Sequence, residues 1–110
     1  MKCTAVKERR QEFRHPCSLE VVCRPVMGDR TILVTAQGQN ISENGIRLTV
    51  SQPVDPGILM DTQIQDSAEH ISLSRLLRVI YTQAEPDGRW TVGGEFYHEL
   101  SYEELESLGV

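Results

Sequence analysis

Apolar and polar side chains alternate along most of the chain, which is typical of strands that bury one face. In the stretch GIRLTV, for example, Ile46, Leu48 and Val50 are expected to point inward, whereas Arg47 and Thr49 are expected to point outward. Strand-like segments also run over residues 18–26, 31–42, 58–65, 71–84 and 90–96. Six strands at such short intervals predict an all-β fold, either an antiparallel barrel or a sandwich.

The last segment of the chain has a different pattern, which is that of a helix. Ser101 and Glu104 have the spacing of a capping box, in which each residue satisfies a backbone N–H near the helix start. Tyr102, Leu105 and Leu108 follow at helical intervals. We therefore expect a short C-terminal helix that covers one end of the barrel.

Composition is consistent with one globular domain, because the chain has 110 residues of which 39% are hydrophobic and 25% are charged. It has no run of about 18 apolar residues that could cross a membrane. Its first residues also lack the apolar segment of a secretory signal. We expect a cytoplasmic protein without membrane insertion.

The three cysteines, Cys3, Cys17 and Cys23, are odd in number and are expected to remain reduced in the cytoplasm. A zinc site built from His15, Cys17 and Cys23 is the alternative. It would lack the closely spaced ligand pair that structural zinc sites have, so burial of these thiols in the core is favoured and no metal is expected.

Charge is distributed unevenly along the chain, whose net charge is −5. Residues 1–30 hold seven Lys or Arg against four Asp or Glu, and residues 31–110 hold four against twelve. An acidic body with a basic N-terminal part repels long polyanions, so we expect no binding of a nucleic acid polymer. A compact anion held by a local arginine cluster remains compatible with this charge.

Catalysis finds little support in the sequence. Ser42 lies outside any Gly-x-Ser-x-Gly elbow, and His15 precedes Pro16 in a segment expected to be mobile. No pair of acids is distinguished from the many expected at the surface. We expect a binding protein rather than an enzyme, with no catalytic residue and no cofactor.

Two segments carry candidate binding residues. In KERRQEFRHP, Arg10 and Arg14 are four residues apart and Arg9 stands beside them. Because Pro16 disfavours helix at His15, the segment should end in an extended or turning conformation. On an extended chain the α-carbons of Arg10 and Arg14 could lie up to about 13–14 Å apart, which would let the two side chains reach around an anion. The alternative is a charged segment that binds nothing.

The second segment is QNISENGIR. Asn40 and Ser42 are two positions apart, so on a strand they would share one face and could reach one ligand edge together. Gly45 would allow either a positive φ or a close approach of the backbone. The alternative is a hairpin whose polar face is simply solvated, because Asn-Gly is a strong hairpin signal.

Together, RQEFR at residues 10–14 and NISENG at residues 40–45 resemble the paired signatures of the PilZ family, Arg-x-x-x-Arg and Asp/Asn-x-Ser-x-x-Gly. VGGEF is similar to the family's Gly-x-x-Phe, with Gly93 and Phe96 matching, and HELSYEELESL is similar to the segment that leads into its terminal helix. The resemblance covers almost the whole chain. It implies a six-stranded antiparallel barrel that binds the bacterial second messenger cyclic di-GMP.

The resemblance also implies roles for particular residues. Arg10 and Arg14 would pair with phosphates or guanines, because guanidinium groups form bidentate hydrogen bonds with both. Asn40 and Ser42 would hydrogen-bond a guanine edge, and Gly45 would let the backbone come close to the ligand. The ligand-binding prediction therefore comprises Arg9, Arg10, Arg14, Asn40, Ser42 and Gly45.

Arg9 has a separate implied role, because the residue before the first motif arginine influences whether one ligand or an intercalated pair is bound. An arginine there favours two ligands per chain. We expect residues 1–15 to form a flexible arm and residues 16–110 to form the barrel domain with its helix. Ligand binding would order the arm and switch the interaction with a downstream protein partner.

Two alternatives remain open. One is a PilZ-like module that binds protein partners but no nucleotide, although the intact motifs argue against it. The other is a small barrel for single-stranded nucleic acid, which would need aromatic stacking platforms and a basic groove. The 5% aromatic content and the acidic body argue against that class.

Overall fold

The computed structural model describes residues 15–28, 33–66 and 71–109, and of residues 15–18 and 71 it describes the backbone without the side chains. Almost all of the expected N-terminal arm lies outside these residues. The division of the chain into an arm and a barrel domain therefore stays a prediction.

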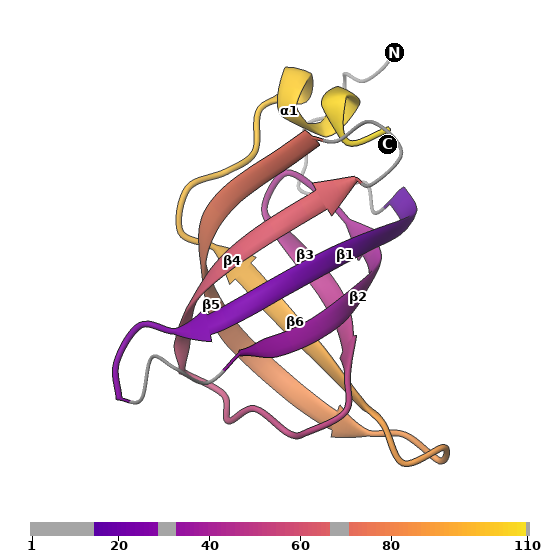
Figure 1. Ribbon diagram of the computed structural model, residues 1–110, viewed down its shortest axis with the longest axis vertical. Helices are drawn as coiled ribbons and strands as arrows, with labels where there is room; N and C mark the ends of the chain where they lie inside the picture. The colour runs from indigo at the N-terminus through magenta and orange to yellow at the C-terminus, as the bar shows by residue number, and fades with distance from the viewer. Residues whose placement is uncertain (1–14, 29–32, 67–70, 110) are drawn as a thin grey trace.

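The described chain forms a closed antiparallel β-barrel (Figure 1). Around the barrel the strands follow the order β1-β2-β3-β6-β5-β4. In chain order the elements are β1 (His15–Pro25), β2 (Val34–Ile41), β3 (Gly45–Val50), β4 (Leu59–Asp66), β5 (Ile71–Ala84), β6 (Trp90–Phe96) and α1 (Tyr102–Ser107). The prediction of six strands and a terminal helix is confirmed, and the closed order decides for a barrel over a sandwich.

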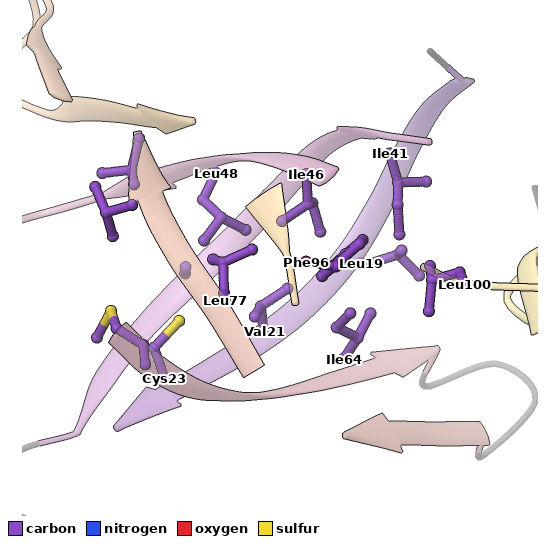
Figure 2. Packing of buried hydrophobic residues seen from close by; sticks show 14 of the residues in the cluster. Leu19, Val21, Cys23, Ile41, Ile46, Leu48, Ile64, Leu77, Phe96 and Leu100 are labelled. Carbon is purple, nitrogen blue, oxygen red and sulfur yellow. The ribbon is translucent and has the colours of Figure 1, made fainter. Parts of the chain in front are cut away.

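The interior of the barrel is filled by the inward-facing side chains of the strands. Alternation holds in β3 as expected, since Ile46, Leu48 and Val50 are buried and Arg47 is exposed. Figure 2 shows labelled side chains from all six strands gathered in one cluster. Because apolar burial is the main favourable term in folding, this cluster holds the barrel together.

Cys23 is part of this core. Its thiol is free and buried, and burial raises the pKa of the Cys23 thiol from 9.0 to about 12. The expectation that the thiol is buried in the core is confirmed for this cysteine. Cys3 and the side chain of Cys17 lie outside the described part of the structure.

The C-terminal helix α1 covers one end of the barrel (Figure 1). Its capping box is formed as expected, because the Ser101 side chain accepts a hydrogen bond from the backbone N–H of Glu104 and the Glu104 carboxylate accepts one from the backbone N–H of Ser101. Leu105 and Leu108 are buried in the core cluster. Among the described residues, no helix is long and apolar enough to span a bilayer.

Arg75 of β5 ties the helix and its leading segment to the barrel wall. Its guanidinium donates hydrogen bonds to the backbone carbonyls of His98 and Glu99, and it forms an ion pair with the carboxylate of Glu104. The backbone N–H of Ser101, followed by the guanidinium of Arg75, lowers the pKa of Glu104 below its ordinary value of 4.5. The ionised carboxylate is therefore the form that stabilises this end of the barrel.

Replacing Glu104 with Gln keeps an acceptor for the cap but removes the charge that pairs with Arg75. We expect Glu104→Gln to lower the melting temperature at pH 7 by about 2–5 °C. Because the folded-state pKa of Glu104 is lowered, its contribution is complete above pH 4.5 and is lost as the pH falls through the folded-state value. The difference from wild type should thus shrink below pH 4.5 in thermal unfolding measured across pH.

The matched control is Glu103→Gln, because Glu103 lies in the same helical turn and is exposed. An equal loss in both variants, or a difference for Glu104→Gln that does not change with pH, would contradict the role of the Arg75 ion pair.

Candidate functional site

The turn that joins β2 to β3, residues 42–45, is built around the hydroxyl of Ser42. The Ser42 side chain is only 1% exposed, and its oxygen accepts hydrogen bonds from the backbone N–H groups of Asn44 and Gly45, each at 3.3 Å. The backbone N–H of Ser42 donates to the carbonyl of Gly45 at 2.9 Å. The hydroxyl thus satisfies buried backbone donors that would otherwise destabilise the turn.

The structure places Asn40 and Ser42 differently from the expectation that they share one strand face. Strand β2 ends at Ile41, so Ser42 already belongs to the turn and is buried. Asn40 is half-buried on β2 and pairs with Arg47 of β3, whose side chain faces outward. Because directly paired residues on neighbouring strands project to the same side, Asn40 lies on the outer wall of the barrel.

Glycine at position 45 could be required either for a positive φ or for a close approach of the backbone. The described glycines with positive φ are Gly28, Gly57, Gly88 and Gly109, and Gly45 is not among them. A Cβ added at Gly45 would lie 2.3 Å from the carbonyl oxygen of Gly94 in β6. Close backbone approach is therefore the reason for glycine at this position, and the approaching group is the neighbouring strand.

The turn is also bonded to the segment that leads into α1. The backbone N–H of Phe96 donates to the carbonyl of Asn44 at 2.7 Å, and that of Leu100 donates to the carbonyl of Glu43 at 2.8 Å. Phe96 and Leu100 are both buried in the core cluster. The turn is consequently held from two sides, by Ser42 within it and by the end of β6 with the segment that follows.

Two β-bulges shape the outer wall next to this turn. The pairing of β2 with β3 shifts between Gly38 and Asn40, and the pairing of β5 with β6 shifts between Val79 and Tyr81. A bulge inserts one extra residue and reverses which side chains face outward beyond it. Strict alternation from the buried Gly38 and Val79 would point Asn40 and Tyr81 inward, and the bulges turn both side chains outward.

These shifts align four positions on four neighbouring strands, which we call the outer row: Asn40, Arg47, Gly93 and Tyr81. Asn40 pairs with Arg47, Arg47 pairs with Gly93, and Gly93 pairs with Tyr81. A Cβ added at Gly93 would lie 2.1 Å from Cε2 of Tyr81, so the tyrosine ring lies over the glycine. Tyr81 is nevertheless 39% exposed.

Arg47 is exposed and makes no ion pair with any residue that the structure describes. By contrast, Arg75 pairs with Glu104, Arg78 with Glu95 and Arg89 with Asp87. On an acidic body, an arginine that no acid neutralises is a local source of positive potential. The outer row therefore combines an amide, a cation that forms no ion pair with a described residue, and an exposed aromatic residue.

Sequence reasoning predicted the outward orientation of Arg47 but missed Tyr81. The only available signal was the alternation of apolar residues in the segment, and that signal would place Tyr81 inside the barrel together with Leu77 and Val79. A bulge leaves no mark of its own in this segment, so the orientation could be found only from the register of β5 with β6.

The predicted arginines Arg9, Arg10 and Arg14 lie outside the described residues. Strand β1 begins at His15, whose α-carbon pairs with that of Ile41 next to Asn40. Among the side chains that the structure describes, no group of three His, Cys, Asp or Glu is placed to hold a metal ion.

An open groove of about 420 Å³ lies elsewhere on the barrel. It runs over β1, β4 and β5 and is lined by residues that include Val22, Arg24, Asp61, Gln63, Ser74 and Leu76. In Figure 1, β1 and β4 cross the front of the barrel and β3 and β6 lie behind them. The groove and the β3–β6 part of the outer row therefore lie on opposite sides of the barrel.

Comparison with known proteins agrees with this architecture. The family model described as the PilZ domain matches residues 8–109. A structure of the inhibitor of motility MotI from Bacillus subtilis is similar, with a TM-score of 0.69 and 18% identity over 93% of this chain and 49% of that chain. No curated protein matches the chain.

Two further similar structures contain c-di-GMP. The PilZ domain of YcgR from Escherichia coli with c-di-GMP has a TM-score of 0.67 and 12% identity over 93% of this chain and 87% of that domain. The MrkH–c-di-GMP complex of K. pneumonia has a TM-score of 0.66 and 12% identity over 93% of this chain and 49% of that chain. This chain thus spans about half the length of MotI and MrkH, and at these identities the likeness shows the fold.

The Ser42 hydroxyl can be tested through stability. Ser42→Ala leaves the N–H groups of Asn44 and Gly45 without their acceptor, so we expect the free energy of unfolding to fall by about 1–3 kcal/mol in denaturant titrations. Ser51→Ala, at an exposed serine that follows β3, is the control and should stay within about 0.5 kcal/mol of wild type. Equal stability of the two variants would mean that the hydroxyl does not support the turn.

Proposed function

This chain belongs to the PilZ domain family, and on that basis we propose that it is a receptor for cyclic di-GMP. PilZ domains are binding modules rather than enzymes, in keeping with the expectation from the sequence. The observation that carries the proposal is the construction of the Asn-x-Ser-x-x-Gly segment. It forms a turn supported from two sides, directly after a strand that presents Asn40 on the outer wall.

Asn40 and the turn would supply base recognition. The side-chain amide of Asn40 has both a donor and an acceptor, so it can hydrogen-bond a guanine edge. Asn40 carries no charge where Asp is common in the family, and the pairing with guanine N–H donors is accordingly weaker than that of a carboxylate. Ser42 would contribute to the same site by holding the turn in shape, because its hydroxyl is buried against the backbone of Asn44 and Gly45.

Arg10 and Arg14 would supply the positive charge. Guanidinium groups match phosphate oxygens and the O6 and N7 atoms of guanine in bidentate pairs. Strand β1 begins one residue after Arg14, and its first residue pairs with Ile41 between Asn40 and the turn. Because Arg14 directly precedes the residue that pairs with Ile41, the chain connection supports a site shared by the arginines and the turn.

The receptor would act as a switch. Ligand binding would draw the N-terminal arm onto the barrel, because the arm would become ordered against the anionic ligand. The ordered arm would then create a surface for a downstream protein partner. The backbone hydrogen bonds from Phe96 and Leu100 to the turn give a direct connection to the segment before α1. Such a receptor would operate in the bacterial cytoplasm.

The primary test is calorimetric titration of Arg10→Ala and Arg14→Ala with cyclic di-GMP. Each variant should bind at least tenfold more weakly than wild type, because charge-assisted hydrogen bonds contribute about 1.5–3 kcal/mol each. Arg89→Ala is the control, since Arg89 pairs with Asp87 in the turn between β5 and β6. Wild-type affinity in both arm variants would remove the proposed site, and absence of binding by wild type would favour the protein-interaction module.

Arg9 is tested by stoichiometry. If its cation offsets the repulsion between the phosphates of an intercalated pair, wild type should titrate at about two ligands per chain at low salt, and Arg9→Leu at about one. The second ligand should also be lost first as salt is raised. A ratio of one for wild type at low salt would contradict this role while leaving binding itself intact.

A further inference from the structure

We propose that the groove over β1, β4 and β5 is the contact surface between two copies of this chain related by a twofold axis. The groove lies on the opposite side of the barrel from β3 and β6 (Figure 1), so such a dimer leaves the outer walls of those two strands uncovered. The dimer needs no cyclic di-GMP and is independent of the proposed function. Three features of the groove favour a second copy as its occupant.

The first feature is a row of four residues across the groove, which we call the groove row: Leu33, Arg24, Asp61 and Leu76. All four line the groove. Asp61 pairs with Arg24 of β1 on one side and with Leu76 of β5 on the other. Because Val34 pairs with Cys23, Leu33 stands beside Arg24. The order along the groove row is therefore apolar, basic, acidic, apolar.

This order is complementary to itself. A twofold axis that runs parallel to the strands, between Arg24 and Asp61, reverses the row on the second copy. Arg24 then faces Asp61 of the partner subunit, Leu33 faces Leu76 of the partner subunit, and each contact occurs twice. Arg24 is exposed and forms no ion pair with a residue that the structure describes. A carboxylate accepts several hydrogen bonds, so Asp61 can receive this guanidinium and keep the contacts of its own chain.

The second feature is the low charge of the adjoining rows. Thr35, Val22, Gln63 and Ser74 pair in turn across four strands, and none of them is charged. The next row holds one charge, that of Glu20, which lies between two glutamines. Two chains of net charge −5 repel each other, so close approach is favoured at a face of this kind. Depletion of charge also distinguishes the core of an interface from the remaining surface.

The third feature is the apolar surface and the area of this face. Leu33 is 52% exposed and lines the groove together with the half-buried Val22 and Leu76, so contact removes apolar surface from water. Four strands and three outward rows span roughly 20 Å by 20 Å with their side chains. Two such faces bury about 1,000 Å² in total, which is the lower limit for a specific interface. We therefore expect a weak dimer whose population rises with protein concentration.

The competing explanations are that the groove is only solvated or that it receives a segment of another protein. In both cases the pure chain stays monomeric. Reversal of the two charges of the groove row separates these explanations from a dimer. Attraction between copies requires opposite charges at Arg24 and Asp61 but does not depend on which position carries which sign.

The test is sedimentation velocity of the full chain from about 10 µM to about 1 mM, with thermal unfolding of each variant as the check on folding. Wild type should dimerise with and without cyclic di-GMP. Arg24→Asp and Asp61→Arg should each weaken the dimer by about tenfold or more, because like charges then face each other twice. The double variant, which restores opposite charges, should dimerise within about threefold of wild type.

Leu33→Ser should weaken the dimer by about fivefold or more, because it removes apolar contact from the groove row. Ile80→Ser is the matched control, since Ile80 is a 48% exposed aliphatic residue of β5 outside the described lining of the groove, and it should dimerise like wild type. A wild-type chain that is monomeric at about 1 mM would overturn the proposal. Wild-type association of Arg24→Asp or Leu33→Ser, a double variant as weak as the single ones, or a dimer that forms only with cyclic di-GMP would overturn it as well.

Discussion

The close contact of β3 with β6 is the constraint on which the rest of the structure depends. These strands are not neighbours in the sequence, and their pairing places the backbone of Gly45 so near the carbonyl of Gly94 that no side chain fits between them. The same pairing brings the turn after β2 beside the end of β6 and the segment that follows it, where the backbone N–H groups of Phe96 and Leu100 donate hydrogen bonds to the carbonyls of Asn44 and Glu43. This close contact between two backbones thus also supports the candidate site.

The outer wall acquires its chemistry from departures from regular strand pairing. In a regular barrel the alternation of side chains would direct Asn40 and Tyr81 into the core, where an amide or a phenol would need a partner. One extra residue in each strand turns them outward instead, into line with Arg47 and Gly93. Bulges are common beside functional sites for this reason, since they redirect a few side chains while the core stays closed.

Much of the fold could be predicted because it follows from periodicity. The strands, the buried leucine, isoleucine and valine positions and the capping box of Ser101 and Glu104 all repeat local rules that need no partner strand. The placement of Ser42 and Tyr81 could not be predicted in this way, because it depends on where β2 ends and on the register between strands far apart in sequence. Likewise, nothing in the local sequence shows that Gly45 is required by Gly94. The arginines of the arm were identified from motif spacing, which is information about a family rather than about packing.

We propose that the turn over residues 42–45 and the neighbouring Asn40 form the part of the ligand site that lies on the barrel. This proposal can be tested by NMR, by following the backbone amide shifts of isotopically labelled protein during titration with cyclic di-GMP. We expect the largest shifts in the barrel to fall on that turn and on Asn40, and cyclic di-AMP at the same concentration to produce smaller ones. Shifts concentrated instead on the groove over β1, β4 and β5, around Arg24 and Asp61, would contradict it.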